Sequence, residues 1–337
     1  MIDIDAIKKI DSQGMHKVYD NWPNMSTEAY NSEHEQISFS DIDNIVFVGM
    51  GGSGTIGDVF ASILSKTKMH FSIVKGYHLP NTVDSNTLVV ATSISGNTVE
   101  TLTALDSAKK LTDKVIAISS GGEMEKYCKN AGIDFRRISQ QHSARASFPI
   151  FLYSLLKILK PILPIKENDI RQSLNELKNL QSDIATTNLD GNNPALNIAK
   201  WINGIALIYY PWGLNAAAIR FKNSLQENAK THASVEDVIE TCHNGIVSWE
   251  RPSIVQPILL EGKDDYIKTK ERWKILKEYF IDNKIDYKEV FTVNGSILSK
   301  LINLIYLLDY ISIYCAILSN VDPSPVNSID FIKKKIN

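Results

Sequence analysis

The feature of the sequence that most constrains its fold is an alternation, from about residue 44, of short apolar runs with helical stretches. Each run is continuous and β-rich, as expected of strands that are buried on both faces, and helical stretches follow several of them. The runs are NIVFVGM, HFSIVKG, TLVVATS, KVIAISS and FRRIS. This alternation predicts an α/β domain built on a parallel sheet.

The same pattern begins again in the second half of the chain. GIALIYYPW, SIVQPILLEG and KEVFTV have the character of strands, and the helical stretches GLNAAAIRFKNSLQENAK and KTKERWKILKEYFIDN separate them. A chain of 337 residues is long enough for two domains, each with its own core. The sequence therefore predicts the α/β class, with two doubly wound domains that are each a parallel sheet flanked by helices. The expected limits are a helical segment at 1–43, a first domain at 44–165, a helical connection at 166–192, and a second domain with C-terminal helices at 193–337.

Charge and cysteine content narrow the functional classes. The chain has 36 Lys and Arg residues against 38 Asp and Glu residues, so the concentrated basic surface of a nucleic-acid-binding protein is not predicted. Its three cysteines are far apart and form neither a C-x-x-C pair nor a disulfide framework. The N-terminus MIDIDAIKKIDSQGMHK has acidic residues and no apolar signal-peptide core. These observations favour a cytoplasmic protein.

One apolar run, residues 298–318, is nearly long enough to cross a bilayer. Asp309 lies in its middle, and several Asn and Ser residues interrupt it. An ionised carboxylate is costly in lipid, so the run predicts a core helix at an internal or subunit interface, and no membrane partner is expected.

The stretch VFVGMGGSGTIGD, residues 46–58, satisfies the pattern G-x-G-x-x-G. A dinucleotide-binding fold would also place an acidic residue at the end of the second strand, about 20 residues on, to receive the ribose hydroxyls. The second strand, HFSIVKGYH, ends without one, and no Lys-Ser or Lys-Thr follows the glycines as in a nucleoside triphosphatase. What remains is a turn of Gly51, Gly52 and Ser53 ahead of a helix. It suits an anion, or it is a tight turn that only needs glycine flexibility.

A second motif favours the anion. ATSISGNTVET, residues 91–101, follows the strand TLVVATS and places the hydroxyls of Ser93, Ser95 and Thr98 around Gly96, ahead of a helix. Three hydroxyls and several helix-start amides can satisfy the oxygens of one phosphate without a lysine, whereas an ordinary helix cap would use one hydroxyl. Open α/β sheets bind their ligands at the carboxyl ends of strands, so this position indicates a phosphate site.

Together these motifs resemble the sugar isomerase (SIS) domain, and other segments narrow the resemblance. HSARASFPIFLY at 142–153, QENAKTHASVEDVIETCHNGIVSWE at 226–250, and VDPSPVNSIDFIKKKI at 321–336 resemble the bifunctional phosphoglucose/phosphomannose isomerases. The resemblance covers nearly the whole chain in the right order. It implies two SIS-type domains and a reversible aldose-ketose isomerisation of hexose 6-phosphates.

The implied reaction moves a proton between C1 and C2 of the opened sugar through an enediolate. The resemblance implies that Glu227, in QENAK, is the base. It implies that His243, in CHNGI, opens the sugar ring and comes from the neighbouring subunit of a homodimer. Arg145, in HSARASFP, is implied to stabilise the enediolate with its fixed positive charge.

The C-terminal segment is expected to complete the site. The resemblance implies that Lys333 assists ring opening, with Lys334 and Lys335 left open as alternatives for the aligned position. Related sequences often carry a hydroxyl residue just before the terminal helix, which makes room for either C2 epimer. This chain has Ser324 and then Val326 there, which puts activity on mannose 6-phosphate in question.

No cofactor and no metal are expected, because the seven histidines are scattered and form no H-x-x-x-H pair. The expected partners are a hexose 6-phosphate substrate and a second copy of the chain. Two alternatives stay open at this point. One is an amino-sugar phosphate isomerase or deaminase of the same domain family, and the other is a non-catalytic sugar-phosphate sensor, which would need no base.

Overall fold

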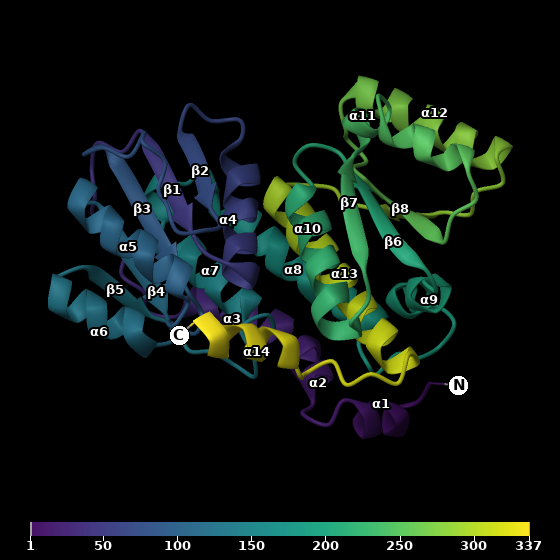
Figure 1. The fold of residues 1–337 in the computed structure, drawn as a ribbon, viewed down its shortest axis with the longest axis horizontal. Helices are drawn as coiled ribbons and strands as arrows, with labels where there is room; N and C mark the ends of the chain where they lie inside the picture. The colour runs from purple at the N-terminus through teal and green to yellow at the C-terminus, as the bar shows by residue number, and fades with distance from the viewer. Residues whose placement is uncertain (1, 337) are drawn as a thin grey trace. The chain divides into compact units, whose positions relative to one another are not determined.

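Two parallel sheets carry the strands of the computed structural model, which describes residues 2–336 (Figure 1). The chain divides into two compact units. The five-stranded unit consists of Asn21–Leu174 and Ser296–Leu298. The four-stranded unit consists of Met1–Asp20, Asn175–Gly295 and Ser299–Asn337. The chain therefore has the predicted α/β class, and the domain limits given above stay predictions.

In the five-stranded unit, each of the five predicted apolar runs forms a strand. The strands are β1 (Asn44–Val48), β2 (His70–Val74), β3 (Thr87–Thr92), β4 (Val115–Ser119) and β5 (Asp134–Arg137). They pair in parallel in the order β2-β1-β3-β4-β5. The helices of this unit are α3 (Trp22–Asn31), α4 (Gly51–Leu64), α5 (Val99–Leu111), α6 (Gly122–Ala131) and α7 (Phe148–Ile158), and α8 (Glu167–Ile184) begins in it.

Helices cover both faces of this sheet. Val46, Val89 and Val115 pack in one cluster with Leu105 of α5 and Met124 of α6. The opposite face carries Phe47, whose ring stacks on Phe60 of α4 with the ring centroids 5.8 Å apart. Strands that are buried on both faces explain the continuous apolar runs in the sequence and confirm the doubly wound prediction.

The four-stranded unit repeats the same plan. Its strands are β6 (Ile205–Tyr210), β7 (Ala233–Asp237), β8 (Val255–Glu261) and β9 (Lys288–Phe291), parallel in the order β7-β6-β8-β9. The sequence predicted three of these strands and missed β7. The helices are α1 (Ile4–Ile10), α2 (Met15–Asp20), α9 (Pro194–Trp201), α10 (Asn215–Ser224), α11 (Val238–Thr241), α12 (Ile267–Asp282), α13 (Ile297–Leu318) and α14 (Asn327–Ile336).

The long apolar helix α13 lies in the core. By length and composition it could cross a membrane, but 94% of its most apolar window is buried inside the protein. The start of the chain packs on it: the Tyr306 hydroxyl donates to the carbonyl oxygen of Tyr19 at 2.9 Å, and the Tyr310 hydroxyl bonds to the Asp20 carboxylate. These contacts support the prediction of a core helix.

Candidate functional site

The predicted phosphate site lies where the direction of winding changes in the five-stranded sheet. β1 has β2 on one side and β3 on the other, and Val48 pairs with Ala91 at their carboxyl ends. The loops that follow β1 and β3 therefore leave the sheet side by side. Open α/β sheets bind ligands at such a switch point.

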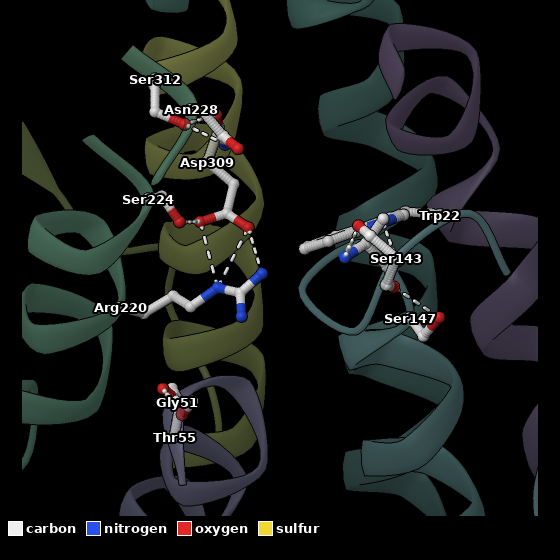
Figure 2. Close-up of polar contacts among 11 residues, drawn as sticks. Trp22, Gly51, Thr55, Ser143, Ser147, Arg220, Ser224, Asn228, Asp309 and Ser312 are labelled. Atoms are coloured by element: carbon white, nitrogen blue, oxygen red, sulfur yellow. Dashed lines mark hydrogen bonds and ion pairs between the residues drawn. The ribbon is translucent and has the colours of Figure 1, made fainter. Parts of the chain in front are cut away.

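The glycine motif forms the start of α4 itself. The sequence predicted a turn of Gly51, Gly52 and Ser53 ahead of the helix, and this detail is wrong, because α4 begins at Gly51. The backbone enters with Gly51 at φ +52, and the Thr55 hydroxyl donates to the Gly51 carbonyl oxygen at 3.2 Å (Figure 2). Met50, the residue that precedes the helix, gives no side-chain cap. Without such a cap, the first backbone amides of α4 can donate hydrogen bonds to an anion.

The second motif folds into a loop that its own hydroxyls support. The Ser93 hydroxyl donates to the Thr98 hydroxyl oxygen at 2.9 Å and accepts from the Gly96 amide at 3.1 Å. Ser93 is buried, whereas Ser95 is exposed. Thr98 precedes α5 but makes no side-chain cap, so this helix start also keeps its amides for another acceptor.

The two loops are tied to each other. The Ile94 amide donates to the Ser53 hydroxyl oxygen at 3.3 Å. A Cβ atom on Gly49 would lie 3.0 Å from the Thr92 carbonyl oxygen, so a larger residue there would crowd the two loops. The structure therefore places the two predicted phosphate motifs side by side, and their role in phosphate binding stays a prediction.

Sequence reasoning missed a brace from the loop after β4. A Cβ atom on Gly96 would lie 1.8 Å from the Gly121 carbonyl oxygen. The Met124 amide donates to the Gly96 carbonyl oxygen at 2.9 Å, and the Glu123 amide donates to the Asn97 side chain at 3.0 Å. The only signal in the sequence was the glycine pair directly after the run KVIAISS.

A lysine stands at the end of β2, where a dinucleotide-binding fold has an acidic residue. The Lys75 Nζ atom lies 2.6 Å from the buried Asp58 carboxylate of α4. Burial raises the pKa of Asp58, and Lys75 opposes that rise. The ribose of a dinucleotide would therefore meet a lysine in place of a carboxylate, in agreement with the sequence analysis, which excluded a dinucleotide site.

Arg145 lies in the five-stranded unit, in the turn before α7, and is buried. The turn is fixed from both sides. The Ser147 hydroxyl donates to the Ser143 carbonyl oxygen at 2.9 Å (Figure 2) and bonds to that of Gln141 at 2.9 Å. The Trp22 ring N–H donates to the Ala146 carbonyl oxygen at 3.0 Å. The nearby arginines of β5 have acidic partners, Arg136 with Asp134 and Arg137 with Glu125.

Glu227 lies in the four-stranded unit, on a turn of π-helix at Leu225–Ala229 that continues α10. Its side chain is half-buried. Lys230 ends this turn with a φ of +57. The Lys230 Nζ atom donates to the Glu227 carbonyl oxygen at 2.7 Å and to those of Asp322 and Pro323 at 3.1 and 3.2 Å. Nothing in the local sequence indicated that Lys230 would bond to the segment that leads to α14.

His243 and Lys333 belong to two further elements of the same unit. His243 is exposed in the turn that follows α11, where its amide donates to the Glu240 carbonyl oxygen at 2.9 Å. Lys333 is exposed on α14, and Val326 directly precedes that helix, as predicted. Within residues 2–336, no three His, Cys, Asp or Glu side chains form a group suited to a metal ion.

Two family models match the chain. Residues 38–155 match the SIS domain, and residues 191–336 match the bacterial phospho-glucose isomerase C-terminal SIS domain. The bifunctional phosphoglucose/phosphomannose isomerase of Caldicellulosiruptor bescii is 31% identical over 89% of this chain and 91% of that protein. The D-glucosamine-6-phosphate 4-epimerase of Sulfolobus acidocaldarius is 29% identical over 69% of this chain and 72% of that protein.

A solved structure supports the fold. A hypothetical protein from Thermus thermophilus superposes with a TM-score of 0.76 at 14% identity, covering 98% of this chain and 93% of that one. The same family is indicated by the sequence identity over about nine-tenths of the chain, by both family models and by the fold. The chain belongs to the SIS-domain family of bifunctional phosphoglucose/phosphomannose isomerases.

Proposed function

We propose that this chain catalyses the reversible isomerisation of hexose 6-phosphates, glucose 6-phosphate to fructose 6-phosphate and also mannose 6-phosphate. The observation that carries the proposal is the pair of helix starts without side-chain caps at the switch point of the five-stranded sheet, in a chain of this family. Such a pair suits a phosphate dianion, because free amides and the positive ends of two helix dipoles converge on it.

In this proposal the phosphate is bound by the amides of Gly51, Gly52 and Ser53 and by the loop before α5. Ser95 and Thr98 supply hydroxyls to the phosphate oxygens. Ser93 supports the loop from beneath, because its hydroxyl hydrogen is already donated to Thr98. No lysine is required, since the amides and helix dipoles supply the positive potential.

The proton transfer is assigned to Glu227. Its carboxylate takes the proton from C2 of the open aldose and delivers it to C1, while the hydroxyl proton of O2 passes to O1. Arg145 carries the fixed positive charge that stabilises the enediolate between these steps. His243 and Lys333 open the ring by exchanging protons with the ring oxygen and O1. The reaction needs no metal and no cofactor.

We further propose a cytoplasmic homodimer in which His243 completes the site of the partner subunit. The exposure of His243 supports this arrangement. So does α14, on which no residue is buried although it carries Ile329, Phe331 and Ile332, exposed by 38%, 65% and 55%. Apolar side chains on an amphipathic helix suit a protein interface.

The test is isomerisation of fructose 6-phosphate with excess EDTA, with glucose 6-phosphate and mannose 6-phosphate quantified separately. Both products are expected from the wild type, and Glu227→Gln should lower kcat by at least about a hundredfold, as loss of a general base does. Glu278→Gln, at an exposed glutamate of α12, is the matched control and should keep full activity. Glucose 6-phosphate alone would assign a C2 preference to Val326, and no product from the wild type would overturn the proposal.

A second candidate has one observation in its favour, the similarity to an epimerase of glucosamine 6-phosphate. Glucosamine 6-phosphate would then be converted, with release of ammonia or with a change of configuration in the sugar. Incubation of the wild type with that substrate, followed by an ammonia assay and sugar analysis, separates this activity from isomerisation. Phosphate-sugar binding without any conversion would indicate a sensor.

A further inference from the structure

A buried ion pair lies in the helical layer that carries Glu227. Arg220 of α10 is 2% exposed and Asp309 of α13 is fully buried. The Arg220 Nη2 atom lies 2.7 Å from the Asp309 carboxylate, and its Nε atom lies 3.1 and 3.2 Å from the two carboxylate oxygens (Figure 2). The Ser224 hydroxyl, one turn further along α10, donates to the same carboxylate at 2.6 Å.

The contact between these two helices continues up to the residue next to Glu227. The Asn228 side-chain amide donates to the Ser312 hydroxyl oxygen at 2.8 Å, and that hydroxyl donates to the Asp309 carbonyl oxygen at 2.6 Å. Arg220, Ser224 and Asn228 each bond to a residue of α13, so they form one row that faces this helix. Glu227 is the immediate neighbour of the last member of this row.

Packing alone does not explain the pair. Transferring two charges from water to a protein core carries a large desolvation cost, and apolar residues of similar volume often stabilise a fold as well. A charged pair with several hydrogen bonds does, however, define one geometry for the groups that it joins. The backbone changes from α-helix to π-helix at Leu225, directly after Ser224, and π-turns of this kind often carry functional residues.

The ion pair keeps Arg220 in its charged form. Burial lowers the pKa of Arg220, but the Asp309 carboxylate outweighs it and holds that pKa above its usual value, with smaller contributions from Tyr19 and Glu227. Arg220 therefore stays charged, compensated by Asp309.

We infer that Arg220 and Asp309, with Ser224, are the positioning residues of Glu227: they fix the π-turn that carries the catalytic carboxylate. The inference rests on the proposed role of Glu227 as the base. The proposed function gives neither Arg220 nor Asp309 a contact with the sugar. Their removal should misplace the carboxylate and slow proton transfer, while the phosphate loops of the other unit keep their affinity.

The kinetic test compares Asp309→Asn, Arg220→Lys and the double variant Arg220→Met/Asp309→Leu with the wild type. We expect kcat for fructose 6-phosphate to fall at least about tenfold in Asp309→Asn and in the double variant, because misplacing a reacting group by about 1 Å can cost a hundredfold. KM should change less than about threefold, since the phosphate loops are intact. Arg220→Lys keeps the positive charge but loses the planar guanidinium, so its kcat should lie between those of these two variants and that of the wild type.

The matched control removes a comparable ion pair in the same unit, in which Lys277 of α12 lies 3.0 Å from the largely buried Glu261 of β8. Lys277→Met/Glu261→Leu should leave kcat within about twofold of the wild type, because this pair is not joined to α10. The double variant at Arg220 and Asp309 guards against simple unfolding, since replacement of a buried pair by apolar residues is often tolerated. Wild-type kcat in a folded double variant would overturn the inference.

Amide hydrogen exchange gives a readout that does not depend on activity. Exchange at residues 225–231 should be at least about tenfold faster in Asp309→Asn than in the wild type, with residues 255–261 of β8 unchanged. If the wild type lacks isomerase activity but these amides lose protection, the proposed function fails and the positioning of the π-turn stands. If protection of 225–231 is unchanged, the positioning role fails whatever the activity.

Discussion

At the scale of single residues, Gly96 decides whether the phosphate loop can form. It has a φ of +72, and a Cβ atom there would lie 1.8 Å from the Gly121 carbonyl oxygen. We predict that Gly96→Ala lowers the free energy of unfolding by about 2 to 4 kcal/mol, because a clash with backbone adds to the strain of a left-handed conformation. The KM for fructose 6-phosphate should rise at least severalfold, since the loop that holds the phosphate must shift. Urea unfolding and steady-state kinetics measure the two effects.

Gly132 supplies the matched control for this substitution. Its φ is +64, but apart from Gly132 and its chain neighbours no heavy atom of residues 2–336 lies within 4 Å of the position that a Cβ atom would take. Gly132→Ala should therefore cost only the backbone strain, about 1 kcal/mol, and leave KM unchanged. Equal effects of the two substitutions on KM would contradict the role given to the brace from the loop after β4.

At the scale of secondary-structure elements, Lys230 joins the π-turn to the segment before α14. We predict that Lys230→Met lowers kcat about tenfold or more, because it frees the carbonyl oxygens of Glu227, Asp322 and Pro323 from a shared cation and loosens both segments. Lys284, which follows α12 and has the same φ of +57, provides the control. Steady-state kinetics should show wild-type kcat for Lys284→Met. A similar loss of kcat in both variants would mean that the effect comes from the backbone conformation and not from the contacts of Lys230.

Elements were predictable from the sequence where burial leaves a local pattern. β1, β3 and β4 are buried along their whole length, so each was recognised as a continuous apolar run. β2 and β5 are only partly buried edge strands, and the alternation of strands with helices indicated them. β7 was missed because Ala233–Asp237 reads ASVED and its residues are only partly buried or exposed at the edge of the sheet. The phosphate motifs were recognisable because their hydroxyls and glycines lie close together in the sequence.

The parts that could not be predicted depend on contacts between distant segments. Nothing local in KVIAISSGG indicates that Gly121 meets Gly96. Asp309 stood out as a charge in an apolar helix, but its partner lies 89 residues away at Arg220. The predicted start of α4 was too late, because the glycines at 51 and 52 suggested a loop. In the structure Gly51 is the first residue of the helix.

At the scale of the whole molecule, the proposed sharing of His243 between subunits can be tested by mixing two inactive variants, Glu227→Gln and His243→Ala. Random pairing makes half of the dimers mixed, and each mixed dimer then has one site with both residues intact, so about a quarter of wild-type activity should return. The assay needs exchange of subunits, checked with differently tagged chains. No recovery in proven mixed dimers would place His243 and Glu227 in the same subunit's site.

The division of the chain also affects the order in which the protein is made and folded. The five-stranded unit is nearly continuous, from Asn21 to Leu174, so most of it can fold as soon as it leaves the ribosome. The four-stranded unit includes α1 and α2 at the start of the chain. Asp20 bonds to Gln181 and Thr186, but Tyr19 and Asp20 also bond to α13, almost three hundred residues later. A ribosome-bound chain that stops before α13 lacks these contacts to α13, so it should expose α2 to proteases while the five-stranded unit is already protected.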